Sequence, residues 1–261
     1  MIPLRLATLV LLFAHCTSSL FAADPRDQAI ADANAHIKQP TKELLSSLCF
    51  VVIGYEGNLP LFKAGTVPPP QNGTGIAVPI DAAGYFLTAA HSVVSEYDMY
   101  VVGTFNGQFK ALKAEIVYRG NPAQTENDYS ILKVQETITT CLTFAPNLPK
   151  EGETVYAAVR LQSQAVLAEG TCRTVPDNYG AGRTLVITSD IPVIGGDSGG
   201  PLLTSDLKLI GLTSRGMRVW GFVRTQSCCP SMSAIQTQIE HHKIKPSPAA
   251  SKADAPATPP R

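Results

Sequence analysis

The chain has 261 residues, of which 44% are hydrophobic and 16% charged, and its formal net charge is zero. This length and composition suit one large domain, or two closely packed lobes, with a sizeable core. The neutral balance and the single Trp exclude a strongly basic, aromatic-rich nucleic-acid surface and an acidic disordered chain. We therefore expect no nucleic-acid partner.

The first 23 residues have the features of a secretory signal peptide. Arg5 supplies a positive charge, residues 6–14 form an uncharged apolar run, and small residues follow. Such a run is too short to cross a bilayer as a helix, so we expect cleavage after Ala22 or Ala23, no membrane span, and a secreted or periplasmic protein. Lipoprotein processing at Cys16 is an alternative, although a histidine precedes it where a small residue is normally needed.

Residues 24–48 are polar and Ala-rich, and they predict a leader of one or two short helices. From residue 49 onward, short runs of β-forming residues alternate with turn signals. One set of runs covers about residues 49–140 and a second about 150–228, with a Pro- and Gly-containing connector between them. This pattern predicts an all-β fold in two halves of about six strands each, which could be structural duplicates.

The C-terminal region departs from the β pattern. Residues 231–242 have a helical pattern, with Ile235 and Ile239 four positions apart on one face. Residues 243–261 are rich in Pro and Ala, and this composition predicts a disordered tail because it cannot bury a core.

Five cysteines remain once the predicted signal peptide is removed: Cys49, Cys141, Cys172, Cys228 and Cys229. Disulfides are permitted in a secreted chain, but an odd number leaves at least one thiol free or paired between chains. The favoured pair is Cys141 with Cys228 or Cys229, which would tie the connector to the last structured segment. No CxxC pair is present, so we expect no metal site, and nothing indicates an organic cofactor.

The segment GGDSGGPLL places Ser198 between glycines, as a nucleophile on a tight turn would be. Serine attack on a carbonyl needs a nearby base and a group that orients it. His91 ends the apolar run YFLTAAH, and Asp128 precedes the run YSILKV. Taken singly, His91 would be an ordinary residue at the end of a strand, and Asp128 an ordinary turn residue. The other histidines lie in the leader or at the end of the last helix: His36, His241 and His242.

Taken together and in order, TAAHSVV, NDYSILKV and GGDSGGPLL resemble the three signature segments of the chymotrypsin/trypsin-like serine proteases. NGTGIAV, GETVYAAV and KLIGLTSRG are similar to the bacterial trypsin-like branch that includes the HtrA proteases. The resemblance covers about residues 50–225, and we expect no PDZ domain after it. It implies a protease domain over residues 49–242, built from two six-stranded antiparallel β-barrels and a short C-terminal helix, with protein or peptide substrates.

The resemblance also implies residue roles. Ser198 would be the nucleophile, His91 the general base and then acid, and Asp128 the group that orients the imidazole. The backbone N–H groups of Gly196 and Ser198 would form the oxyanion hole. Residues 214–216 would pair with the substrate backbone as an added strand.

The implied specificity pocket is neutral, which predicts a small or medium apolar side chain before the cleaved bond. Its residues, with those of the substrate-pairing strand, are Pro192, Val193, Thr213, Ser214, Arg215 and Gly216, and Gly221 would complete the pocket wall. Arg215 could favour an acidic side chain further upstream in the substrate, or it could be a solvated surface arginine.

Asp197 precedes the nucleophile, and in digestive relatives the matching acid pairs with a newly released N-terminus. This chain has no basic residue followed by an Ile-Val-Gly-Gly start. We therefore expect an internal cation to pair with Asp197, from Arg160, Arg173 or Arg183, and an enzyme that is active without propeptide cleavage.

Three other interpretations are weaker. GDSGG also fits the nucleophile elbow of α/β-hydrolases, but that motif needs a helix directly after the serine and a downstream acid and histidine. A catalytically silent protease homologue that acts as a binding module is the main alternative, although such homologues usually lose a triad member. A structural or adhesive β-protein would leave the ordered motifs unexplained.

Overall fold

The structure is a computed structural model that describes residues 24–37, 41–54, 75–105, 107–161, 164–174, 185–219 and 222–244. The predicted signal peptide, most of the predicted tail, Arg183 and Gly221 lie outside these ranges. Within the described ranges, no helix is long and apolar enough to span a membrane.

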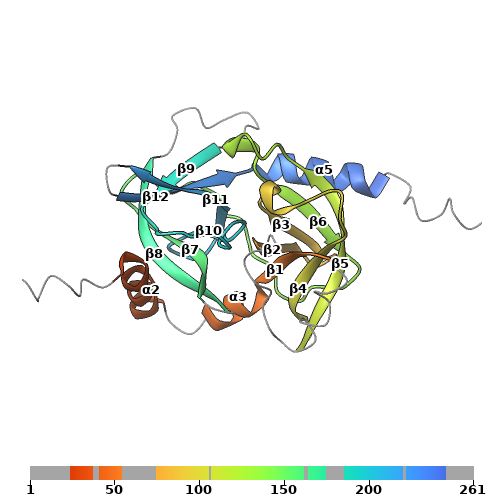
Figure 1. Cartoon of the computed structure of the whole chain (residues 1–261), viewed down its shortest axis with the longest axis horizontal. Helices are drawn as coiled ribbons and strands as arrows, with labels where there is room; N and C mark the ends of the chain where they lie inside the picture. The colour runs from red at the N-terminus through yellow and green to blue at the C-terminus, as the bar shows by residue number, and fades with distance from the viewer. Residues whose placement is uncertain are drawn as a thin grey trace, which may run out of the picture.

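Twelve strands form two closed antiparallel barrels, which lie beside each other in Figure 1. The first barrel contains β1 (Cys49–Ile53), β2 (Gly75–Asp81), β3 (Tyr85–Thr88), β4 (Met99–Phe105), β5 (Gln108–Arg119) and β6 (Ser130–Val134). The second contains β7 (Thr154–Leu161), β8 (Gln164–Thr174), β9 (Leu185–Ser189), β10 (Pro201–Thr204), β11 (Leu209–Val219) and β12 (Phe222–Cys229).

Both barrels connect their strands in the same way. The spatial order is β1-β2-β3-β6-β5-β4 in the first barrel and β7-β8-β9-β12-β11-β10 in the second. The two halves therefore share one strand topology. The predicted fold class, two six-stranded antiparallel barrels with a short C-terminal helix, is confirmed.

Alternation along the strands divides the core into three clusters. In β1 every residue is buried, but Cys49 and Val51 belong to the cluster that fills the first barrel, whereas Phe50 and Val52 belong to a cluster that both barrels share. A third cluster, with Ile187 among its members, fills the second barrel. Successive side chains point to opposite faces of a strand, so a strand that is apolar throughout can serve two cores.

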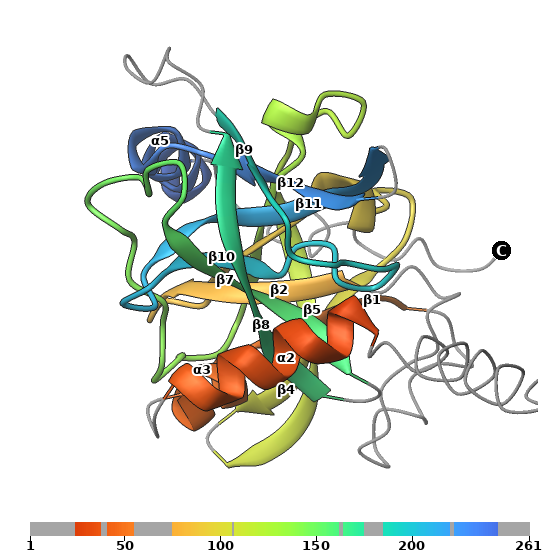
Figure 2. The ribbon, with the colours of Figure 1, turned by 90° about the vertical axis from the view of Figure 1, so that its left-hand side faces the viewer.

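Helices cover the outside of the barrels. Helix α2 (Pro25–His36) lies across β8 on the second barrel, as Figure 2 shows, and α3 (Thr41–Ser47) leads into β1. Helix α5 (Met232–Ile244) follows the last strand of the second barrel and returns to β5 of the first, burying Ile235 and Ile239. It extends two residues into the predicted tail.

The predicted disulfide is wrong, because none of the five cysteines within the described residues forms a disulfide. Cys141 packs against the cluster of the first barrel, Cys229 lies in the cluster of the second, and Cys228 lies in the shared cluster. These positions belong to separate parts of the core. Burial raises the pKa of the Cys229 thiol to about 12, so the thiol is protonated at neutral pH.

Candidate active site

Three turns bring the predicted triad residues to the junction of the barrels. His91 lies on the 3-10 turn η2 (Ala90–Ser92) after β3, and Asp128 follows the 3-10 turn η3 (Thr125–Asn127) before β6. Strands β3 and β6 are antiparallel neighbours, with Thr88 paired to Ser130, so the end of one and the start of the other share an edge. Ser198 lies on the turn before β10 of the second barrel.

The three side chains form a continuous hydrogen-bonded series. Nδ1 of His91 lies 2.7 Å from Oδ2 of Asp128, and Nε2 of the same ring lies 2.7 Å from Oγ of Ser198. The backbone N–H of His91 also donates to Oδ1 of Asp128 at 2.9 Å. The carboxylate thus holds both the ring and the backbone of His91.

The protonation of this series follows from the environment of Asp128, whose side chain is fully buried. Burial works to raise the pKa of Asp128, but hydrogen bonds from His91 and Ser214 outweigh it and leave the pKa below its ordinary value. An ionised carboxylate can only accept, so the ring proton belongs on Nδ1 of His91. Nε2 is then free to accept the hydroxyl proton of Ser198.

Ser214 contributes through its side chain as well as its strand. Its hydroxyl donates to Oδ2 of Asp128 at 2.5 Å. The ladder between β11 and β12 shifts register between Thr213 and Arg215, so Ser214 is the extra residue of a β-bulge. Bulges re-aim side chains, and this one directs Ser214 toward Asp128. The sequence predicts Ser214 only as part of the substrate-pairing strand, and no motif signals its contact with Asp128.

The turn that immediately precedes Ser198, residues 194–197, has a defined shape. The N–H of Asp197 donates to the carbonyl of Ile194 at 3.2 Å, and Gly196 at the third position has φ +101°. Positive φ at that position is the signature of a type II turn and favours glycine. The Ser198 carbonyl accepts from the N–H of Ile76 at 2.7 Å, which ties the turn to the first barrel.

The N–H groups of Gly196 and Ser198 donate to no acceptor in the part of the chain that the structure describes. Both residues are partly exposed, so an entering group can reach them. Two backbone donors on one turn can stabilise an oxygen that develops negative charge.

The salt bridge of Asp197 is formed by an arginine that was not predicted. Its buried carboxylate pairs with Arg26 of the leader helix, with Nη1 2.7 Å from Oδ2 and Nη2 3.0 Å from Oδ1. Arg160 donates its backbone N–H to Oδ1 at 2.6 Å and its guanidinium also interacts electrostatically with Asp197, whereas Arg173 pairs with Asp190. Arg183 lies outside the described residues. No motif in the sequence marks Arg26.

The predicted substrate residues lie along β11 and the segment before the turn. Pro192 and Val193 are half-buried, and Thr213 is buried with its backbone bonded to Gly199 and Gly200. A Cβ atom at Gly216 would lie 3.0 Å from Cγ2 of Val193, so the two segments face each other closely. The exposed Arg215 donates from Nη2 to the carbonyl of Pro122 at 2.6 Å, across to the first barrel.

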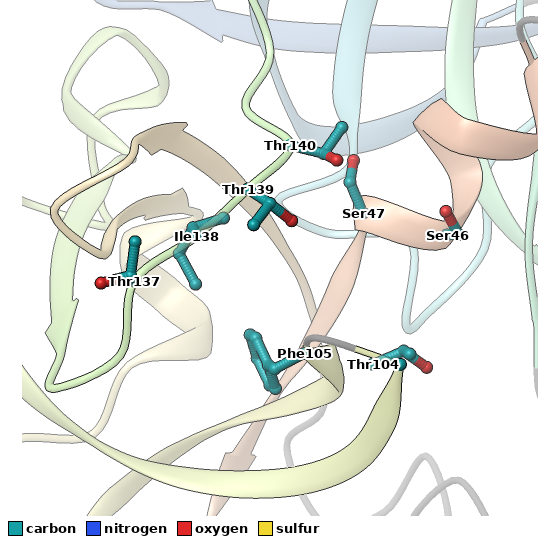
Figure 3. A pocket seen from close by; sticks show the side chains of 9 residues that line it. Ser46, Ser47, Thr104, Phe105, Thr137, Ile138, Thr139 and Thr140 are labelled. Atoms are coloured by element: carbon teal, nitrogen blue, oxygen red, sulfur yellow. The ribbon is translucent and has the colours of Figure 1, made fainter.

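A separate hollow, shown in Figure 3, contains none of these residues. It has a volume of about 260 Å³ and is lined by Ser46, Ser47, Thr104, Phe105, Gly107, Thr137, Ile138, Thr139 and Thr140. No charged side chain lines it. Among the described residues, no group of three or more His, Cys, Asp or Glu side chains is placed to hold a metal ion.

Solved structures with the same fold include proteases from two bacteria. A serine endoprotease from Yersinia pestis matches with a TM-score of 0.56 and 14% identity, over 85% of this chain and 67% of that chain. The Rv3671c protease from M. tuberculosis in its active form matches with a TM-score of 0.53 and 19% identity, over 76% of this chain and 82% of that chain. The inactive form of Rv3671c matches with the same TM-score and identity, over 77% of this chain and 91% of that chain. At these identities the likeness establishes the fold.

A search of curated protein sequences finds no match. The family model of the trypsin-like peptidase domain matches residues 73–212, which is more than half of the chain. The matched segment includes His91, Asp128 and Ser198. The chain therefore belongs to the trypsin-like peptidase domain family.

Proposed function

We propose that the protein is a serine endopeptidase that hydrolyses peptide bonds through an acyl-enzyme, with His91, Asp128 and Ser198 as its catalytic triad. The observation that carries the proposal is the hydrogen-bonded series from Asp128 through His91 to Ser198 beside two unused backbone donors. Membership of a peptidase family supports the same conclusion.

In the first half of the reaction, Oγ of Ser198 attacks the carbonyl carbon of the scissile bond. The new C–O bond forms as the hydroxyl proton passes to Nε2 of His91. The carbonyl oxygen becomes an anion, which the N–H groups of Gly196 and Ser198 stabilise. Collapse of this intermediate breaks the C–N bond, and His91 returns the proton to the leaving amine.

In the second half, water replaces the amine. His91 takes a proton from the water as its oxygen attacks the acyl carbon, and the C–O bond to Ser198 then breaks. The serine regains its proton from His91, and the acid product leaves. Asp128 stays ionised throughout and stabilises the imidazolium that forms twice, in keeping with its lowered pKa.

Substrate recognition is assigned to β11 and the segment before the turn. Residues 214–216 would pair with an extended substrate as an added strand. Val193 and Thr213 offer no charge to the side chain before the cleaved bond, so we expect a preference for small or medium apolar residues there. Protein or peptide chains are the expected substrates.

We also propose that the enzyme works outside the cytoplasm, as a secreted or periplasmic protein. The support is the composition of residues 1–23, with a basic residue, an apolar run and small residues before Ala23. N-terminal sequencing of the exported protein tests this directly. A mature protein that begins at Ala23 or Asp24 is expected, and a retained N-terminus would contradict it.

The test of the activity is labelling of the protein lacking residues 1–23 with a fluorophosphonate. An activated serine forms an O–P bond to the probe as fluoride leaves. We expect labelling of the wild type and of Lys113→Ala, which removes an exposed ion pair on the first barrel. Labelling should disappear in Ser198→Ala and His91→Ala. Folded wild-type protein that does not react would favour the catalytically silent homologue.

A further inference from the structure

The Arg26 guanidinium joins three segments of the second barrel at one point. Besides its two bonds to Asp197, Nη1 donates to the carbonyl of Pro192 at 2.9 Å, and Nη2 donates to the carbonyl of Arg160 at 2.8 Å. The Arg26 side chain is 11% exposed and that of Asp197 is fully buried. The planar guanidinium of an arginine has enough N–H donors, suitably oriented, to make these four bonds together. The ammonium group of a lysine has only three N–H donors and cannot.

The Asp197 carboxylate accepts hydrogen bonds that fix the backbone just before the nucleophile. Its Oδ2 accepts from the backbone N–H of Ile194 at 2.8 Å, and its Oδ1 accepts from that of Arg160 at 2.6 Å. Asp197 lies between Gly196 and Ser198, whose N–H groups are the proposed oxyanion donors. Arg26 is the cation hydrogen-bonded to this buried carboxylate, so its loss would leave the charge poorly compensated and would favour movement of the turn toward solvent.

Arg26 reaches this position because helix α2 docks on the second barrel. Pro25 stands at the start of the helix, and the Asp24 side chain accepts from the backbone N–H of Arg26, which fixes the first turn. Ala29 and Ile30 enter the cluster that fills the barrel. Figure 2 shows that the helix lies on the outer side of β8, so it covers the barrel without forming part of it.

We propose that Arg26 is a positioning residue for catalysis and that docking of α2 turns the active site on by holding Asp197 and the Gly196–Ser198 turn in place. The proposal rests on the function proposed above. It makes the leader an intramolecular activator, so that displacement of α2 would leave a folded but inactive protease.

The test compares Arg26→Ala with two controls in the protein lacking residues 1–23, at a temperature where all are folded by circular dichroism. Gln28→Ala removes an exposed hydrogen bond on the same helix but keeps both the cation and the docking residues, and Lys113→Ala removes a remote exposed pair. Arg26→Ala should lower kcat and the phosphonylation rate by about 100-fold or more, with KM changed by less than about threefold. Arg26→Lys should fall between Arg26→Ala and the wild type, and both controls should stay near wild type.

A double variant separates charge from packing. In Arg26→Ala/Asp197→Asn the buried side chain at position 197 is a neutral amide whose oxygen can still accept a hydrogen bond from a backbone N–H. The turn before Ser198 should therefore largely regain its wild-type conformation. We expect it to react about tenfold faster than Arg26→Ala alone. Equal rates in the two variants would overturn the proposal, because the loss would then not run through the charge of Asp197. Rates that fall in Gln28→Ala as far as in Arg26→Ala would overturn it too.

Hydrogen–deuterium exchange provides a readout that does not depend on activity. Arg26→Ala should speed exchange in peptides that contain residues 194–200, and Lys113→Ala should not. If the wild type fails to react with the probe but Arg26→Ala shows this faster exchange, the proposed activity is wrong and the positioning role stands. Unchanged exchange over residues 194–200 would overturn the positioning role in either case.

Discussion

The Ser214 hydroxyl on the second barrel donates a hydrogen bond of 2.5 Å to Oδ2 of Asp128 on the first. The same oxygen accepts a hydrogen bond from Nδ1 of His91, so residues of both barrels bind one buried carboxylate. The orientation of His91 therefore depends on both halves of the fold. Any motion of one barrel against the other would disturb the series that leads to Ser198.

Ser214→Ala should weaken this arrangement without dismantling it. The variant removes one of the hydrogen bonds that lower the pKa of Asp128, so that pKa rises. Activity falls as Asp128 is protonated, and the acid limb of the kcat/KM profile should shift to higher pH. At neutral pH we expect a loss of about tenfold, which corresponds to about 1.4 kcal/mol.

Ser130→Ala is the matched control for that variant. Ser130 is also a buried serine near the site, but its hydroxyl has no hydrogen-bond partner among the described residues. Removing an unpartnered hydroxyl is neutral or slightly stabilising. A pH profile that shifts equally in Ser130→Ala and Ser214→Ala would contradict the role given to the Ser214 bond.

Two neighbouring glycines make a sharper comparison. Gly196 has φ +101°, so Gly196→Ala strains the turn and displaces a proposed oxyanion donor. Loss of one such donor typically costs about 3 kcal/mol in the barrier, so kcat should fall by about 100-fold or more. A Cβ at Gly195 would meet no atom within 4 Å, and Gly195→Ala should keep kcat within about threefold of wild type. Steady-state kinetics on both variants provides the measurement, and equal losses would count against the assigned donors.

Much of the architecture could be predicted because its signals are local. The short apolar runs mark the strands, and strand β1 is apolar throughout because it serves two cores at once. The segments that hold His91, Asp128 and Ser198 are each a few residues long. The closure of each half into a barrel came from the family resemblance, since alternation alone does not specify which strands pair.

The contacts that escaped prediction join distant parts of the chain. Arg26 and Asp197 are 171 positions apart, and nothing in the sequence of the leader distinguishes Arg26 from other surface arginines. The contact of Ser214 with Asp128 arises from a bulge, and a bulge leaves no clear trace in hydrophobic alternation. The disulfide prediction failed for a related reason, because cysteine spacing does not reveal which core each thiol enters.

The end of helix α2 should make stability depend on pH. Nδ1 of the exposed His36 lies 2.7 Å from Oε2 of Glu169 on β8, and this hydrogen bond raises the pKa of His36, with Asp32 adding to the shift. A raised pKa stabilises the fold when the histidine is charged. The contribution is fully present below the unfolded value of about 6.5 and is lost as pH rises through the folded value.

His36→Gln should therefore lower Tm only on the acid side of this transition. The difference in Tm between wild type and His36→Gln is expected to be small, because His36 is exposed and solvent screens the pair. It should be largest below about pH 6.5 and vanish at alkaline pH. A difference that grew toward alkaline pH would show that the pair does not hold α2 against β8.

The five cysteine thiols of the described residues, none of which is in a disulfide, give a chemical test of the three-cluster core. Cys141 is half-buried, whereas the other four cysteines of the described residues are buried. Iodoacetamide reacts with the thiolate, and burial both blocks the reagent and disfavours the thiolate. Cys141, the least buried of the five, should therefore react fastest. In the native protein lacking residues 1–23 we expect Cys141 to be alkylated first, with the rest reacting only on unfolding.

Mass spectrometry after alkylation in denaturant, without a reductant, should then find all five cysteines modified. Cys141→Ser should retain the wild-type Tm within a few degrees, because its side chain fills no fully closed space. Cys229→Ser should lower Tm further, since it places a hydroxyl in the apolar cluster of the second barrel. If two cysteines resisted alkylation until a reductant was added, the chain would contain a disulfide, and the separation of these thiols into different clusters would be wrong.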